Sequence, residues 1–181
     1  MNGLLQALIF LLDAVAGFVA GVFLLRFIMQ AARVSFSGPL GHFVITVTNW
    51  GVRPLRRVVP AFRSWDVSSL LAAYLVQLVF QGILLALIAS GPLLAGVDWL
   101  PHLLLASLRG LARVAIGLYI IALILQAVLS WVNPYSPIAG PVNQLTRPLL
   151  APIRRFLPPI GGIDLSPLVA ILLLQALLLV L

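Results

Sequence analysis

Two arginine pairs, each followed closely by an aspartate, carry the strongest chemical signal in the sequence. The sets are Arg56, Arg57 and Asp66 in one half of the chain and Arg154, Arg155 and Asp164 in the other. Guanidinium groups bind phosphate and carboxylate oxygens through paired hydrogen bonds. The arginine pairs are therefore predicted to contact lipid headgroups or a protein partner.

The two aspartates lie just before apolar segments, at D-x-S sequences that end in Ser68 and Ser166. An acid at this place caps a helix and suits the positive end of the helix dipole. We expect these aspartates and serines to serve as helix caps, and the aspartates to form salt bridges with the preceding arginines. A phosphate-handling site built from Arg154, Arg155 and Asp164 is the alternative.

Asp13 is the one charged residue inside the first long apolar run, residues 4–25. A carboxylate at that depth of a membrane needs a partner or must be neutral. A shift of the chain by 98 residues places Asp13 between Arg109 and Arg113. We hypothesise an ion pair between Asp13 and Arg113, with Arg109 as the second choice. Its role is helix packing or, alternatively, a proton or ion relay.

Three glutamines are the other polar residues expected within the membrane: Gln77, Gln81 and Gln175. Because polar side chains at that depth turn toward other helices, we expect Gln77 and Gln175 to meet at the centre of the bundle. A hydrogen-bonded packing contact is the simpler interpretation, and the lining of an ion path is the alternative. Gly17 and Gly21 form a G-x-x-x-G sequence that permits close helix packing, either internally or in a dimer.

The composition shows which elements must position these residues. Of the 181 residues, 62% are hydrophobic and 8% are charged, which excludes a water-soluble domain. All eleven basic residues are Arg and all four acids are Asp, giving a net charge of +7, and there is no Cys. This charge suits anionic lipids, and direct nucleic-acid binding is not expected.

We predict an all-α membrane protein with four transmembrane helices in two parallel tandem repeats, each with an amphipathic interfacial segment. Repeat 1 is residues 1–90, with spans 4–25 and 67–90 around an interfacial segment 37–63. An external linker, 91–102, leads to repeat 2 at 103–181, with spans 103–131 and 167–181 around an interfacial segment 134–160. Nine of the eleven arginines fall in or beside the interfacial segments. The positive-inside rule then places these segments in the cytoplasm and both termini outside.

The repeat rests on a gapless self-alignment at the shift of 98 residues, which would relate the halves by a twofold axis along the membrane normal. The matched pairs include Pro39 with Pro137, Thr48 with Thr146, Pro54 with Pro152, Asp66 with Asp164, and Gln77 with Gln175.

Within the first interfacial segment we expect a helix from Leu40 whose apolar face holds Phe43, Val44, Val47 and Gly51. A separate unit between Pro54 and Pro60 should span less than two turns. Its residues Leu55, Val58 and Val59 should point inward.

The string PIRRFLPPIGGIDLSP at 152–167, with its fainter copy PLRRVVPAFRSWDVSS at 54–69, closely resembles the YggT family, also called YlmG. The resemblance spans the chain, although the first copy lacks the Gly-Gly-Ile before the aspartate. It implies a small bacterial inner-membrane protein with plastid relatives. Family members have been linked to osmotic tolerance and ion uptake, to cell division, and to assembly of a photosynthetic cytochrome complex. The resemblance supplies no catalytic residue.

We therefore predict a non-enzymatic assembly or scaffold factor without a cofactor or metal. His42 and His102 fall on opposite membrane faces, and Gly161-Gly162 lacks the lysine of a phosphate-binding loop. The expected partners are anionic lipids, a membrane protein complex and, as an open alternative, further copies of the chain. The alternative function is a small channel or ion-transport component in osmotic or ion homeostasis, which would use Asp13, Gln77 and Gln175 and would need a wet path at an oligomer axis.

Overall fold

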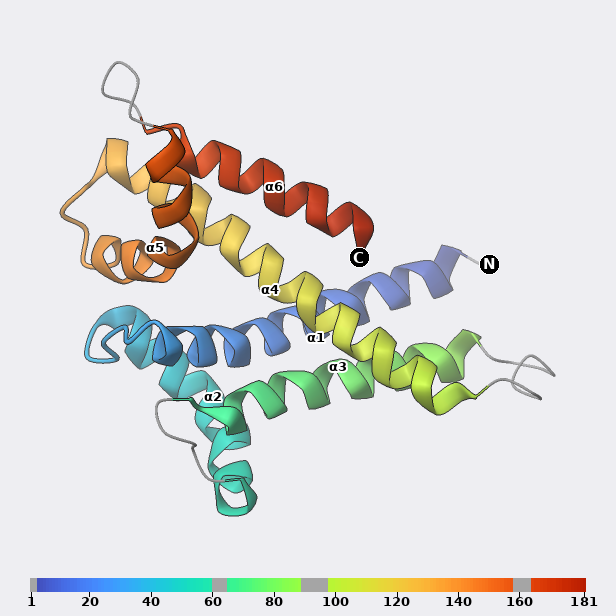
Figure 1. Ribbon diagram of the computed structural model, residues 1–181. Coiled ribbons are helices and arrows are strands. Elements are labelled where there is room, and N and C mark those ends of the chain that lie inside the picture. Colours follow the sequence, from blue (N-terminus) through green and yellow to red (C-terminus); the bar gives the residue numbers. More distant parts are fainter. Residues whose placement is uncertain (1–2, 60–64, 89–97, 158–163) are drawn as a thin grey trace.

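The structure, a computed structural model, describes residues 3–59, 65–88, 98–157 and 164–181, which fold into six helices (Figure 1). The helices are α1 (Gly3–Ala31), α2 (Pro39–Val58), α3 (Val67–Ile88), α4 (Trp99–Val132), α5 (Ala139–Phe156) and α6 (Ser166–Val180).

Helices α1, α3 and α4 are long and apolar enough to cross a membrane. They contain 29, 22 and 34 residues, respectively. At about 1.5 Å per residue each exceeds the hydrocarbon thickness of about 30 Å. Helix α6 is equally apolar but has 15 residues. The structure thus contains three helices that meet the length of a membrane span and a shorter apolar fourth.

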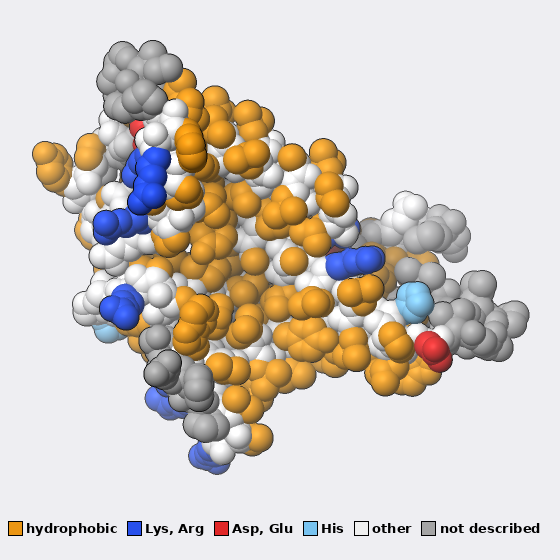
Figure 2. All heavy atoms as spheres, viewed as in Figure 1, with side chains coloured by type: hydrophobic (Ala, Val, Ile, Leu, Met, Phe, Trp, Pro, Cys, Tyr) orange, Lys and Arg blue, Asp and Glu red, His pale blue; other side chains and the backbone are white. Residues whose placement is uncertain are grey.

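The two amphipathic helices, α2 and α5, lie at the same end of the long helices, whereas both chain termini lie toward the other end (Figure 1). Figure 2 shows blue arginine side chains gathered at the α2 and α5 end, beside a broad apolar surface over the long helices. We call this end of the molecule the arginine end. The arrangement brings residues far apart in sequence to one end.

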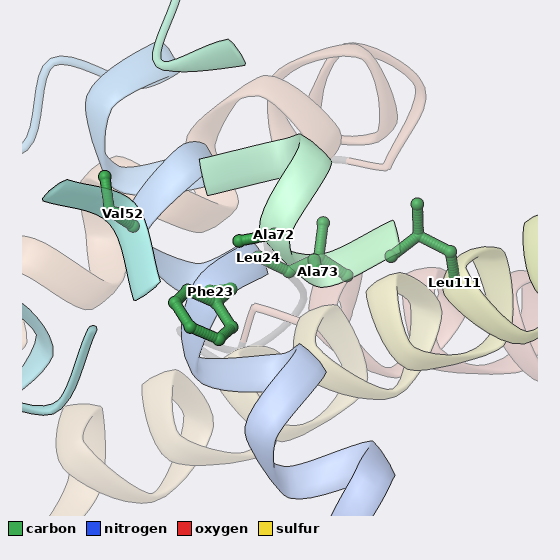
Figure 3. Close-up of a cluster of buried hydrophobic side chains, with 6 residues drawn as sticks. All are labelled: Phe23, Leu24, Val52, Ala72, Ala73 and Leu111. Atoms are coloured by element: carbon green, nitrogen blue, oxygen red, sulfur yellow. The ribbon is translucent and has the colours of Figure 1, made fainter. Parts of the chain in front are cut away.

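One core cluster joins four helices from both halves of the chain. Phe23 and Leu24 of α1, Val52 of α2, Ala72 and Ala73 of α3 and Leu111 of α4 form one buried cluster (Figure 3). The Phe23 ring also lies edge-on against Trp50, with ring centroids 5.6 Å apart. Helix α2 is therefore held on the long helices by its apolar side chains rather than lying free at a membrane surface.

A second cluster joins the two halves at the arginine end. Met29, Val34 and Val44 pack with Leu145, which comes from α5. A third cluster, formed by Leu123, Leu150 and Ala170, joins α4, α5 and α6. These contacts fix both amphipathic helices on the bundle.

The expected short unit from Pro54 to Pro60 is wrong within the described residues. Helix α2 continues through Pro54 to Val58, and α5 likewise continues through Pro148 and Pro152. A proline removes one helical hydrogen bond. Pro54 is exposed, so water or headgroups can satisfy the released carbonyl, while Val52 anchors the helix in the core. Pro60 and Pro158 lie outside the described residues.

The predicted apolar face of α2 is also shifted. The buried residues are Gly41, Val44, Thr48 and Val52, whereas Phe43 is exposed. Val58, expected to point inward, is 79% exposed. Thr48 can be buried because its hydroxyl donates a hydrogen bond to the Val44 carbonyl, 2.6 Å away, as well as receiving one described below. The buried face of α2 therefore consists of small side chains, one of which, Thr48, is hydrogen-bonded within the helix.

Helix α1 runs past the expected end of the first span at Leu25, so Arg26 lies within the helix. It ends where Arg33 adopts a left-handed conformation with φ of 56°. The Val34 amide donates to the Met29 carbonyl at 2.8 Å, and the Arg33 amide donates to the Gln30 carbonyl at 3.0 Å. These two bonds form a Schellman motif, which usually has glycine in this position.

Candidate functional site

The polar residues of the arginine end form two clusters. We define the first corner as Arg26, Thr48, Arg56, Asp66 and Ser69, and the second corner as Gln126, Thr146, Arg154, Asp164 and Ser166. Each corner lies where an amphipathic helix meets the start of the apolar helix that follows it, which is α3 in the first corner and α6 in the second.

In the first corner, two guanidinium groups share one carboxylate. Arg56 NH2 lies 2.6 Å from Asp66 Oδ2, and Arg26 Nε lies 3.4 Å from the same oxygen. The Ser69 hydroxyl donates to it at 2.8 Å. Asp66 is fully buried, while the side chain of Arg56 is 41% exposed. The carboxylate therefore ties the end of α2 and the inside of α1 to the start of α3.

Arg26 links the carboxylate to α2. Its NH1 donates to Thr48 Oγ1 at 2.6 Å and to Asn49 Oδ1 at 3.1 Å. Burying a charge is costly unless it is paired and hydrogen-bonded, and Arg26 meets both conditions. It acts as a polar bridge inside an otherwise apolar helix contact.

Asp66 is held in its charged form. Burial alone would raise its pKa, but the hydrogen bonds from Arg56 and Ser69 and the charges of Arg56 and Arg26 outweigh burial and lower the pKa below its usual value. Asp66 Oδ1 has no hydrogen-bond partner among the described residues. The Asp66 carboxylate therefore accepts hydrogen bonds from the side chains of Arg56 and Ser69, and not from the backbone amides that a helix-capping residue would bind.

The second corner repeats the arginine–aspartate contact in a more open form. Arg154 NH2 lies 2.8 Å from Asp164 Oδ2, and Arg154 Nε donates to the same oxygen at 2.9 Å. The Ser166 amide, at the first residue of α6, donates to Asp164 Oδ1 at 2.9 Å. The Asp164 side chain is 38% exposed. Burial alone would raise the pKa of Asp164, but the hydroxyl and backbone amide of Ser166 and the hydrogen bond and charge of Arg154 lower it.

Ser68 and Ser166 differ in their surroundings. The Ser68 hydroxyl donates to the Val59 carbonyl at 2.6 Å and so fastens the end of α2 to the start of α3. The Ser166 hydroxyl is buried and has no partner among the described residues. The Ser166 side chain nevertheless lies close enough to Asp164 to help lower the pKa of that carboxyl, whereas the Ser68 hydroxyl is directed to Val59.

The remaining arginines of α2 and α5 face outward. Arg53, Arg57, Arg147 and Arg155 are exposed, and the three ion pairs found in the described ranges involve none of them. They form a charged surface at the arginine end. Such a surface can bind phosphate or carboxylate groups.

The charged residues of α1 and α4 come together only loosely. Asp13 and Arg113 line one cleft of about 440 Å³, together with Gln81, but form no direct ion pair in the structure. Both side chains are exposed. Arg109 lines a neighbouring cleft of about 290 Å³ that also includes Gln81 and His102. A cleft wide enough for water explains why the two charges can remain apart.

The expected meeting of Gln77 and Gln175 does not occur. Gln77 is buried against α4, where a Cβ on Gly110 would lie 2.5 Å from the amide oxygen of Gln77. Gln175 is exposed. Gly17 and Gly21 line a groove between α1 and α4, in which a Cβ on Gly21 would contact Val114 and Leu118. Gln77 is therefore buried by its close contact with α4 at Gly110 and not by a pairing with Gln175.

Sequence reasoning gave no role in the corners to five of their members: Arg26, Gln126, Thr48, Thr146 and Ser69. Arg26 lies directly after the expected first span and was not singled out, and Gln126 was given no role. Thr48 and Thr146 were matched in the repeat without a function. The available signal was a single polar residue, Arg26 or Gln126, near the end of an apolar run that leads into an amphipathic helix.

The described residues contain no group of three or more His, Cys, Asp or Glu side chains that could hold a metal ion. Gly161-Gly162 lies outside the described residues. What the two corners and the arginine surface offer is recognition of charged groups. Guanidinium and carboxylate groups are positioned there by short hydrogen bonds.

Helices of membrane-spanning length with two amphipathic helices at one end define a small helical protein suited to a membrane. Comparison with known families agrees, because the CCB3/YggT family model matches residues 5–88 and again residues 105–181. The chain belongs to this family.

Several relatives match over most of the chain. An uncharacterised protein named YggT from Escherichia coli strain K12 is 41% identical over 94% of this chain and 86% of its own length. An uncharacterised protein from Pseudomonas aeruginosa is 38% identical over 97% of this chain and 88% of its own length. The chloroplastic YlmG homolog protein 2 of Arabidopsis thaliana is 40% identical over 34% of this chain and 25% of its own length. No solved structure matches the chain significantly.

Proposed function

We propose that this protein is a non-catalytic assembly factor of the bacterial inner membrane, which binds anionic lipid headgroups and the edges of larger membrane complexes through its arginine end. The observation that carries the proposal is the placement of α2 and α5 at one end, with Arg53, Arg57, Arg147 and Arg155 exposed on them. Basic side chains at a membrane surface attract anionic lipids by about 1 kcal/mol each.

The proposed topology has four membrane crossings in two parallel repeats. Helix α6 with the flanking Leu165 and Leu181 gives an apolar stretch near the lower limit of about 17 residues for a span. The positive-inside rule then puts the arginine end in the cytoplasm and both termini outside. The double match to one family model supports the repeat.

Exposed aromatic side chains support docking at this end. Trp50, Trp131 and Phe156 are 68%, 76% and 86% exposed, respectively. Tryptophan favours the membrane–water interface, where its ring is apolar and its N–H finds a partner. Together with the arginines they form a surface suited to headgroups and to the interfacial part of another membrane protein.

Lipid titration of the purified protein tests the headgroup contact. We expect Arg155→Gln to weaken phosphatidylglycerol binding about fivefold, as loss of about 1 kcal/mol implies. Arg109→Gln is the matched control, because it removes one exposed arginine from the opposite end. Equal loss in both variants, or no loss in Arg155→Gln, would contradict the proposal.

Purification and reconstitution test the assembly role. The tagged protein, extracted in mild detergent, should co-purify with stable membrane partners, and Arg57→Gln with Arg155→Gln should reduce their recovery. The purified protein in liposomes should show no ion flux. A flux abolished by Asp13→Leu would contradict the proposal and support the transport alternative.

A further inference from the structure

The two corners differ in the side chain that pairs with the threonine of the amphipathic helix. In the first corner, the guanidinium of Arg26 binds Thr48 and lies 3.4 Å from Asp66. In the second corner, the matching threonine, Thr146, donates at 2.5 Å to the side-chain oxygen of Gln126. A neutral amide thus occupies the place that a cation holds in the first half.

The exposure of the two carboxylates follows this difference. Asp66, with two arginine partners, is 0% exposed, whereas the side chain of Asp164, with Arg154, is 38% exposed. The first corner shows that this geometry accepts a second guanidinium on one carboxylate. The Arg154–Asp164 pair has no net charge, so it does not strongly repel another cation.

The open side of the second corner is a cavity of about 230 Å³, lined by Gln126, Ser130, Trp131, Arg154 and Asp164 among others. This volume far exceeds the roughly 30 Å³ that one water molecule occupies in the liquid. Its lining offers three kinds of oxygen acceptor: a carboxylate, an amide carbonyl and a hydroxyl. Trp131 adds an aromatic face, on which guanidinium groups stack.

A fourth acceptor lies beside this cavity. Ser166 is 0% exposed, and its hydroxyl has no hydrogen-bond partner among the described residues. It is two residues from Asp164 and next to Pro167, which lines the cavity. The Ser166 side chain also helps to lower the pKa of Asp164, so its hydroxyl lies close to the carboxylate that lines the cavity.

We propose that this cavity binds the guanidinium group of an arginine side chain presented by a partner protein, which completes the second corner as Arg26 completes the first. The inference rests on the proposed function as an assembly factor and names the chemistry by which a partner is recognised. Planarity and several donors fit the carboxylate, the amide oxygen and the indole face better than a compact ammonium does. Exposed Trp131 and Phe156 would lie under the bound partner.

Calorimetric titration of the full chain in detergent tests this with N-acetylarginine amide as the probe. We expect saturable binding at one site, and at least tenfold weaker binding of the citrulline analogue, which is neutral and nearly the same shape. Asp164→Asn should weaken binding at least tenfold. Asp98→Asn, which removes an exposed carboxylate before α4, is the matched control and should leave binding unchanged.

A second variant keeps the test valid where Asp164→Asn fails to fold. Gln126→Arg supplies the guanidinium from within the chain, so it should abolish probe binding and raise the melting temperature. Undiminished probe binding in Gln126→Arg, equal binding of the citrulline analogue, or no binding at all would overturn the proposal. Binding of methylguanidinium without binding of the arginine amide would replace the partner protein with a small cation and would also overturn it.

The failure of this inference is distinguishable from that of the proposed function. Headgroup binding is tested at Arg155 with phosphatidylglycerol, whereas this cavity is tested at Asp164 and Gln126 with an uncharged-analogue control. Failure of the cavity test would therefore not contradict headgroup binding by Arg155, and failure of the headgroup test would not contradict binding of a guanidinium group in the cavity.

Discussion

Replacement of Arg26 by methionine should destabilise the protein more than the same replacement of Arg56, although Arg56 makes the shorter contact with Asp66. Arg56 NH2 lies 2.6 Å from Asp66 Oδ2, and Arg26 Nε lies 3.4 Å away. Distance alone would rank Arg56 first. The ranking reverses because the Arg26 side chain is 8% exposed and that of Arg56 is 41% exposed.

The magnitudes follow from the partners. Arg26 also donates to Thr48 and Asn49, and a hydrogen bond to a charged group contributes about 1.5–3 kcal/mol. Breaking a buried ion pair by removing one partner costs about 3–5 kcal/mol, but Asp66 keeps Arg56 and Ser69. We therefore expect Arg26→Met to cost about 2–4 kcal/mol. Arg56→Met should cost about 1 kcal/mol because solvent screens its contact.

Equilibrium unfolding in detergent micelles measures both variants. Methionine retains most of the apolar stem, so the comparison isolates the charged head. If Arg56→Met proved as destabilising as Arg26→Met, burial would not be the deciding factor and the account of the first corner would be refuted.

Three further predictions concern acid, the α1–α4 cleft and a close contact. The pKa of Asp66 is lowered in the folded state, so its contribution to stability is complete above about pH 4, near its unfolded pKa, and falls as the pH drops toward the folded pKa. The free energy of unfolding, measured from pH 7 to 3, should show this loss. Asp66→Asn should make the free energy of unfolding less dependent on pH in that range. Asp13→Leu and the double replacement with Arg113→Leu should have nearly equal melting temperatures, because both charged side chains are exposed and form no ion pair across their cleft; a clearly lower melting temperature of the single variant would contradict this. A Cβ on Gly41 would overlap the backbone of Phe36, so Gly41→Ala should lower stability by at least about 2 kcal/mol, whereas Gly140→Ala, with open space around it, should not.

The sequence was a good guide to the helices, because their signals are local. Several local patterns predict helices that the structure contains. These are the long apolar runs, apolar residues at every third or fourth position, and the prolines at helix starts, Pro39 and Pro167. The contacts of Arg56 with Asp66 and of Arg154 with Asp164 were also expected from the spacing, although Arg57 and Arg155 take no part in them. The predicted helix break at Pro54 was wrong, because α2 continues through this proline while Val52 packs in the core.

The centre of each corner could not be predicted, because it depends on contacts between distant residues. Arg26 reaches Thr48 across 22 positions, and Thr146 reaches Gln126 across 20. These partners do not coincide under the repeat shift, since Arg26 falls on Ile124 rather than on Gln126. Alignment of the two halves therefore does not reveal that Arg26 and Gln126 occupy corresponding places. Their shared contact with a threonine is seen only in the folded structure.

Single-cysteine labelling of intact cells tests the central claim most directly, because the native chain has no cysteine to interfere. With a membrane-impermeant maleimide, we predict that Arg57→Cys and Arg155→Cys are both labelled only after permeabilisation, whereas His102→Cys is labelled from outside. Labelling of one arginine position from outside and the other from inside would contradict a shared cytoplasmic arginine end.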